Sequence, residues 1–237
     1  MLSASMMDRF AHRRIAVLGD SILDTFVVGE CVKLCREAPV PVIANNSVRD
    51  CPGGAANTAA NLAALGADVR LVSVVGEDAA GERLMRALER GGVGTSAVVR
   101  QRVVTPHKQR ILAGDEYIAR IDEGGGTPPR AGACDALTRS LKEAMHECEA
   151  LVVSDYALGC VCDRTLHLVD RMRARRPVVV DTREMTSAAR VHATVVTPNL
   201  EEACNATGHP VRTLASPTEF EELARSVRRV ANSEAAA

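Results

Sequence analysis

The chain has 237 residues with a formal net charge of −1, and apolar residues make up 46% of it. That is enough for one α/β domain with a sizeable core, which we expect to consist of Ala, Val and Leu because aromatic residues account for only 2%. Acidic and basic residues are interspersed, which excludes nucleic acid and anionic membranes as partners, since both require a concentrated basic face.

The N-terminal segment and the cysteines indicate in which cellular compartment the protein is expected. Residues 1–13 have no apolar run long enough for a signal peptide, and no later run approaches a membrane span. We therefore expect a flexible leader over residues 1–13 and a cytoplasmic protein. Of the eight cysteines, the closest pairs are Cys31 with Cys35 and Cys160 with Cys162. Neither pair has the spacing of a structural zinc site, so we expect free thiols.

The first predicted strand, Arg14–Gly19, is a short apolar run followed by Asp20. In open α/β sheets, ligands bind at the carboxyl ends of buried strands. Asp20 is therefore either a ligand-facing carboxylate or the cap of a turn. No helical period follows it. Instead, Phe26–Gly29 and Val40–Asn45 read as two strands of a small sheet lying over the site.

The segment Pro52–Gly66, PGGAANTAANLAALG, places the pair Gly53 and Gly54 directly at the start of a predicted helix. Glycines let a ligand approach the main chain, and the free N–H groups at the start of the helix would face it. Asn57, one turn into the helix, can both donate and accept hydrogen bonds, which suits a hydroxyl-rich molecule. The alternative is an ordinary turn that leads into a core helix.

The rest of the chain alternates between apolar strands and amphipathic helices, with one hairpin. In chain order we expect a strand at Val69–Val75, a helix at Ala79–Arg90, a hairpin of Lys108–Leu112 with Tyr117–Ile121, a helix at Ala133–Cys148, a strand at Ala150–Ser154, a helix at Cys162–Arg175, strands at Val178–Val180 and Thr194–Thr197, and helices at Leu200–Thr207 and Pro217–Ala231. A further strand should follow the last helix, but residues 232–237 read as a tail.

Four of the predicted strands deliver a polar residue at or just beyond their carboxyl ends. These residues are Asp20, Asp155, Asp181 and Asn199. Because parallel strands end at the same edge of a sheet, this repetition indicates a doubly wound parallel sheet with a polar site along that edge.

Seven stretches, in this order along the chain, resemble the PfkB/ribokinase family of sugar kinases. They are GDSILDTFVVG at 19–29, EAPVPVI at 37–43, PGGAANTAANLAALGA at 52–67, RID at 120–122, SDYALG at 154–159, VDTR at 180–183 and TPNLEEA at 197–203. Within the family, the sequence most resembles the kinase domain of heptose 7-phosphate kinases. The resemblance implies a ribokinase-like domain over residues 14–231, with a β-sheet lid at about 25–50 and 104–122 that is often used for dimerisation.

The resemblance also implies residues on the sugar side of the site. By position, Asp20, Gly53, Gly54 and Asn57 would hold sugar hydroxyls, and Asp155 would lie beside the sugar. The lid region supplies three cations that would bind a sugar phosphate, namely Lys108, Arg110 and Arg120. For Lys108 and Arg110 the alternative is that they are solvated lid charges.

On the nucleotide side, the resemblance implies contacts to ATP and Mg²⁺ from Asp181, Arg183, Asn199 and Glu202. Asn199 and Glu202 match the family's Asn-x-x-Glu. The resemblance implies that this motif organises the nucleotide phosphates and magnesium, the magnesium indirectly through Glu202. Arg183 stands where relatives usually carry lysine, and it keeps the charge but changes the donor geometry.

The family's Gly-Ala-Gly-Asp loop, which supplies an anion hole and the general-base aspartate, is not found in this sequence. We therefore read the fold as C-terminally truncated and assign no catalytic residue. We expect the chain alone to bind ATP poorly and turn over little, because positioning and electrostatic stabilisation dominate phosphoryl transfer. Two hypotheses remain: a heptose 7-phosphate kinase, truncated or completed by a second chain, and a non-catalytic sugar-phosphate-binding or dimerisation module.

Overall fold

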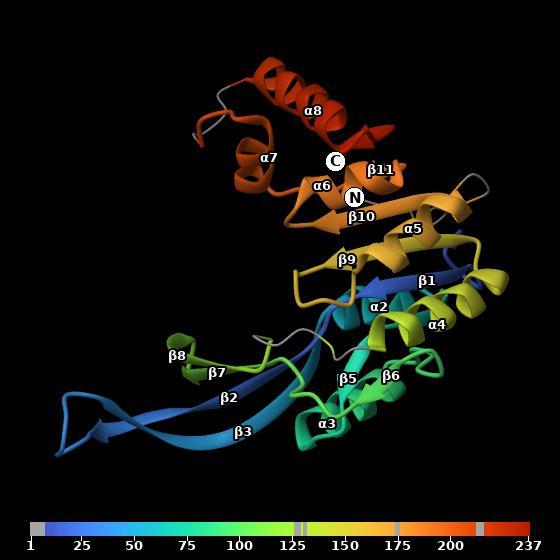
Figure 1. Cartoon of the computed structure of the whole chain (residues 1–237). Coiled ribbons are helices and arrows are strands. Elements are labelled where there is room, and N and C mark those ends of the chain that lie inside the picture. Colours follow the sequence, from blue (N-terminus) through green and yellow to red (C-terminus); the bar gives the residue numbers. More distant parts are fainter. Residues whose placement is uncertain (1–7, 126–128, 130–131, 174–175, 212–215) are drawn as a thin grey trace.

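The structure is a computed structural model that describes residues 8–125, 129, 132–173, 176–211 and 216–237 (Figure 1). Most of the predicted leader and the end of the predicted helix Cys162–Arg175 lie outside these residues. No helix among the described residues is long and apolar enough to cross a membrane.

The centre of the molecule is a six-stranded sheet in the order β12-β11-β10-β9-β1-β4, and every neighbouring pair in it is parallel. Its strands are β1 (Arg14–Gly19), β4 (Asp68–Val72), β9 (Ala150–Asp155), β10 (Val178–Thr182), β11 (Val195–Val196) and β12 (Ala235–Ala236). The strands are mostly apolar and buried on both sides, as a parallel sheet between layers of helices requires.

Helices cover both faces of this sheet, so the predicted doubly wound fold is confirmed. On one face, α2 (Ala55–Ala64) and α3 (Ala79–Arg90) pack in one apolar cluster with Val17 and Leu71. The other face carries a second cluster around Leu18 and Val153. It is formed with α4 (Ala133–Glu147), α5 (Asp163–Met172), α6 (Met185–Val191), α7 (Leu200–Thr207) and α8 (Pro217–Ala231).

A four-stranded sheet in the order β3-β2-β7-β8 extends away from the core, and we call it the lid (Figure 1). It consists of β2 (Ser21–Leu34), β3 (Pro41–Gly54), β7 (His107–Ala113) and β8 (Glu116–Glu123). The hairpin of β7 with β8 was predicted from its spacing. The first pair is much longer than predicted, because β2 starts directly after Asp20 and β3 continues to Gly54.

Two strand predictions are wrong. The run Val69–Val75 divides into β4 and β5 (Val74–Gly76), and β5 pairs with β6 (Val99–Gln101) in a separate sheet. The division falls at buried Ser73, whose hydroxyl donates to the Gly19 carbonyl at 2.7 Å. The expected tail also contains a strand, since β12 pairs with β11. Two alanines carry little strand signal in the sequence, so their position in the fold decides the pairing.

The prediction that the cysteines are free is wrong for two of them. Cys134 and Cys162 form a disulfide with a Cα–Cα distance of 6.5 Å, while the other six are free thiols. Cys134 lies in the first turn of α4 and Cys162 is the N-cap of α5. Because 28 positions separate them in sequence, only the packing of α4 against α5 brings them together.

Candidate functional site

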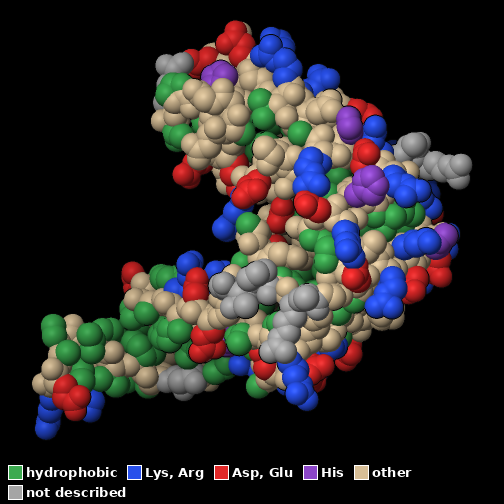
Figure 2. Space-filling model, in the orientation of Figure 1, with side chains coloured by type: hydrophobic (Ala, Val, Ile, Leu, Met, Phe, Trp, Pro, Cys, Tyr) green, Lys and Arg blue, Asp and Glu red, His purple; other side chains and the backbone are tan. Residues whose placement is uncertain are grey.

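A cleft of about 260 Å³ runs along the carboxyl edge of the parallel sheet. Five predicted site residues line it, and Tyr156, Thr182 and Thr197 complete it. The five are Asp155, Asp181, Arg183, Asn199 and Glu202. In the space-filling view the surface is hollowed between the lid and the α7–α8 region, and acidic side chains gather at the inner end of this hollow (Figure 2). The ends of β9, β10 and β11 therefore converge as predicted.

Asn199 and Glu202 fix the start of α7 by capping each other. The Asn199 side chain accepts from the Glu202 N–H at 2.8 Å, and the Glu202 carboxylate accepts from the Asn199 N–H at 2.9 Å. This reciprocal pair is a capping box, in which two helix-end donors are satisfied at once. In the fold, this pair holds one amide and one carboxylate at the rim of the cleft.

Two carboxylates of the cleft, those of Asp155 and Asp181, have raised pKa values. Burial raises the pKa of Asp155, and the nearby Asp20 carboxylate raises it further. Burial also raises the pKa of Asp181, with the Glu202 charge adding to the effect. The Arg183 guanidinium lies over the Tyr156 ring at 5.5 Å, which is within cation–π range. A cation or a hydrogen-bond donor in the cleft would therefore relieve repulsion among these acids.

Asp20 lies deeper than the cleft. Its side chain is buried, and its carboxylate accepts N–H bonds from Tyr156 at 2.9 Å, Leu158 at 3.0 Å and Cys160 at 2.9 Å. The cavity beside it has a volume of about 30 Å³, which is room for a water molecule rather than a sugar. Asp20 thus holds the loop between β9 and α5, and its contact with a sugar stays a prediction.

Gly53 and Gly54 lie where the lid joins the core, and we call this pair the glycine floor. A Cβ built on Gly53 would lie 2.3 Å from the Asp24 carboxylate, and one on Gly54 would lie 2.3 Å from the Asp20 carbonyl. Gly54 also has a φ of 57°, which favours glycine. Asn57 is exposed on α2, so its side chain is accessible to a ligand.

The three predicted lid cations are paired with lid carboxylates in the structure. Arg110 pairs with Asp24, while Lys108 and Arg120 share Asp122 at 2.9 and 2.8 Å. Hydrogen bonding to Asp24 raises the pKa of Arg110, so the guanidinium group stays positively charged. A phosphate would compete with these carboxylates for the same donors.

The opposite side of the lid is held to the core by a polar network. Arg83 of α3 donates to Asp50 at 2.8 Å and to the Thr25 hydroxyl at 3.0 Å, and Thr25 contacts buried His107 at 2.8 Å. The hydrogen bond from Arg83 lowers the pKa of Asp50. Because these four side chains come from α3, β3, β2 and β7, the network fixes the base of the lid on the core.

The donors in the cleft fit a phosphate-bound magnesium ion better than a metal caged by protein. Among the residues that the structure describes, no group of three or more His, Cys, Asp or Glu side chains could hold a metal. Magnesium commonly takes one or two carboxylates and completes its shell with water and phosphate oxygens. Asp181 and Glu202 provide such carboxylates, and Arg183 provides a cation for phosphate oxygens.

The predicted residues thus separate into a lid group and a cleft group, with Asp20 buried beneath the β9–α5 loop. Sequence reasoning missed Asp24, which contacts Arg110 and approaches Gly53. The available signal was the period of two along β2, because it places Asp24 and Phe26 on one face. Tyr156 was also missed; it lines the cleft and its pKa is raised by burial and by Asp181.

The model of the pfkB family of carbohydrate kinases matches residues 13–232. The "Bifunctional protein HldE" of Gluconobacter oxydans is 39% identical over 212 residues, which are 88% of this chain and 44% of that protein. The "D-beta-D-heptose 7-phosphate kinase" of Bordetella bronchiseptica is 36% identical over 202 residues, or 85% of this chain and 64% of that protein. The chain therefore spans less than two thirds of the length of these relatives.

Solved structures agree on the fold. Escherichia coli phosphofructokinase-2 in complex with substrates and products has a TM-score of 0.71 at 18% identity, over 93% of this chain and 70% of that one. Arabidopsis thaliana ribokinase complexed with ribose and ATP has a TM-score of 0.63 at 20% identity, over 95% of this chain and 71% of that one. With the family model covering nearly all of the sequence, the chain belongs to the pfkB family of carbohydrate kinases.

Proposed function

We propose that this chain is the sugar-binding and phosphate-binding part of an ATP-dependent, cytoplasmic heptose 7-phosphate kinase. The reaction is phosphorylation of the anomeric hydroxyl to give the 1,7-bisphosphate. The observation that carries the proposal is the position of the lid cations and the acidic cleft at one edge of the sheet. The identity to the Bordetella heptose 7-phosphate kinase supports the choice of sugar.

On the sugar side, the proposal assigns hydroxyl contacts to Asp24, Asn57 and the main chain at Gly53. A carboxylate, an amide and a close-approach glycine together offer acceptors and donors for a polyol. Lys108, Arg110 and Arg120 would exchange their present carboxylate partners for the phosphate of the sugar. Asp20 acts one layer below, by holding the loop that carries Asp155 and Tyr156.

On the nucleotide side, magnesium-bound ATP supplies the phosphoryl group. The residues that would hold it are Asp181, Arg183, Asn199 and Glu202, which meet in the cleft. Arg183 would orient phosphate oxygens, and Glu202 would hold the magnesium through its water shell. The proposal assigns no general base to this chain. It assigns homodimerisation to the lid, where exposed Val32, Leu34 and Val48 could be covered by a partner.

Titration calorimetry with heptose 7-phosphate tests the proposal. We expect the wild-type chain to bind, and Asn57→Ala to bind about fivefold more weakly, since one hydrogen bond is worth about 1 kcal/mol. The matched control is Asn61→Ala, an exposed position one turn later on α2. Absence of binding by the wild-type chain, or equal affinities of Asn57→Ala and Asn61→Ala, would contradict the assignment.

A coupled assay with ATP and magnesium then tests for kinase activity. Turnover that depends on Arg183 supports the kinase. Because the proposal assigns no general base to this chain, absence of turnover by the chain alone is expected under both alternatives and does not separate them.

A further inference from the structure

One face of the lid presents its charged side chains in two rows. The inner row contains Asp24, with Lys108 and Asp122 on the neighbouring strands in register. The outer row lies two residues further from the core, at about 7 Å along the strands. It consists of Arg49, Phe26, Arg110 and Arg120, which are aligned across β3, β2, β7 and β8.

Arg49 differs from Lys108, Arg110 and Arg120 because it has no acidic partner among the described residues. The Arg49 guanidinium carbon lies 5.2 Å from the centre of the Phe26 ring, and that of Arg110 lies 5.3 Å from the same centre. Two guanidinium groups around one ring repel each other, and an anion between them would relieve that repulsion. The four cations of the two rows face only two carboxylates, so two positive charges are unmatched.

We propose that Arg49 determines specificity for a phosphorylated sugar, by binding the phosphate together with Arg110 at the outer row of the lid. The proposal rests on the function proposed above and adds the direction in which the substrate lies. Its hydroxyls face Asp24 and the glycine floor, and its phosphate ester points away from the core. Phe26 supports both guanidiniums, and the planar N–H edge of Arg49 is available to phosphate oxygens, while Arg110 would exchange Asp24 for the phosphate.

Calorimetry with heptose 7-phosphate and with the free heptose tests this. We expect Arg49→Ala to reduce the preference for the phosphorylated sugar by about tenfold or more while affinity for the free sugar is unchanged. Arg49→Lys keeps the charge without the planar fork and should recover part of the preference. The control is Arg36→Ala, an exposed arginine in the connection between β2 and β3.

The outcomes separate this inference from the proposed function. If the wild-type chain prefers the phosphorylated sugar and Arg49→Ala keeps that preference, the role of Arg49 is refuted while the function stands. If the wild-type chain binds neither sugar, the proposed function fails. An equal effect of Arg36→Ala would mean that general charge, rather than the outer row, attracts the phosphate.

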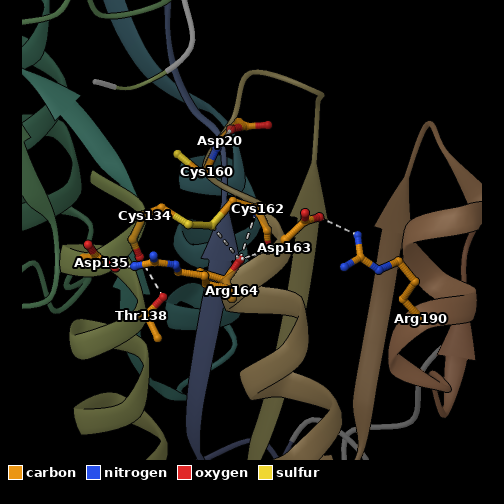
Figure 3. Close-up of a disulfide and its surroundings, with 10 residues drawn as sticks. Asp20, Cys134, Asp135, Thr138, Cys160, Cys162, Asp163, Arg164 and Arg190 are labelled. Carbon is orange, nitrogen blue, oxygen red and sulfur yellow. Dashed lines mark hydrogen bonds and ion pairs between the residues drawn. A yellow bond between two sulfur atoms is a disulfide. The ribbon is translucent and has the colours of Figure 1, made fainter. Parts of the chain in front are cut away.

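The disulfide carries a second, independent inference. Its covalent ring runs from Cys134 through α4 and β9 and around the site loop to Cys162 (Figure 3). That loop supplies Asp155 and Tyr156 to the cleft and three N–H groups to Asp20. An ion pair between Arg164 and Asp135 joins the same two helix starts beside the disulfide.

We infer that Cys134 and Cys162 form a redox latch on this loop. Both cysteines are partly exposed, so a dithiol reductant can reach them. The reductant attacks one sulfur and the S–S bond breaks. Two electrons and two protons pass from the dithiol, which becomes a disulfide, to the two cysteines, which become thiols. Once the S–S bond is broken, α4 and α5 can move apart without the constraint of the closed covalent ring. The loop between β9 and α5 then opens more often.

Hydrogen exchange tests the latch without any ligand. We expect the amides of Tyr156, Leu158 and Cys160 to exchange at least about tenfold faster in reduced than in oxidised protein. The amides of the lid strands β7 and β8 should not change. Cys134→Ser should exchange at the reduced rate under both conditions, whereas Cys31→Ser, which alters an exposed free thiol, should respond like wild type. Equal exchange in both redox states, or eight titratable thiols in unreduced protein, would overturn the inference.

Discussion

Replacing Asp20 by Asn tests whether this carboxylate holds the site loop. Its side chain is 1% exposed and accepts from the N–H groups of Tyr156, Leu158 and Cys160. An Asn amide has one acceptor oxygen, so at least one N–H loses its partner and faces the new NH₂ group. An unsatisfied buried donor costs about 1–3 kcal/mol, and the remaining bonds lose the strength of a charged acceptor. Because Asn does not bury a charge, part of this cost is offset. We therefore expect the free energy of unfolding to fall by about 3 kcal/mol.

Urea denaturation measures that loss, and thermal unfolding should show a midpoint lower by about 6–12 °C for a chain of this size. Asp163→Asn is the matched control, because this carboxylate at the far end of the same loop is 87% exposed. It should lose less than about 1 kcal/mol. If Asp20→Asn were no less stable than Asp163→Asn, the three N–H bonds would not hold the loop and the reasoning would be refuted.

Four further substitutions test the glycine pair and the cleft. Gly53→Ala should displace the Asp24 side chain, abolish the Asp24–Arg110 pair and weaken sugar-phosphate binding in calorimetry with little loss of stability. Gly54→Ala should instead lower the free energy of unfolding by about 3 kcal/mol, because its Cβ would clash with backbone at a positive φ. Asn199→Ala should lose about 1 kcal/mol in urea denaturation, because α7 loses its cap. Asp181→Asn should stabilise the protein at pH 7. Because the pKa of Asp181 is raised in the folded state, the free energy of unfolding of the wild type falls as pH rises through that pKa. The stability difference between Asp181→Asn and the wild type should therefore vanish near pH 4. Urea denaturation at pH 7 and at pH 4 measures this difference.

The parts of the fold that follow local rules could be predicted from the sequence. The alternation of apolar runs and amphipathic helices predicts the parallel sheet, and α3 spans Ala79–Arg90 as predicted. The convergence of Asp155, Asp181 and Asn199 also follows, because parallel strands end at one edge regardless of their order in the sheet.

The parts that depend on tertiary position could not be predicted. Asp20 and Asp24 are equivalent in the sequence as acids near the end of the first strand. The structure separates them because Asp20 falls between the two sheets, where loop amides surround it, while Asp24 lies on a lid face. The disulfide is invisible for the same reason, since neither Cys134 nor Cys162 has a cysteine at a diagnostic spacing.

The connections of the lid decide how it can move relative to the core. Strand β2 begins at Ser21, directly after Asp20, and β3 ends at Gly54, where Ala55 donates to the Asp20 carbonyl at 2.9 Å. Both long strands are therefore fixed at their inner ends to the residues that organise the site, and Arg83 secures the base from behind. Any bending of the lid consequently moves the outer row more than the inner row. If the chain binds a sugar phosphate as proposed, the sugar would meet a nearly fixed glycine floor and the arginines of the outer row could adjust to its phosphate, so we assign discrimination between free and phosphorylated sugars to that row.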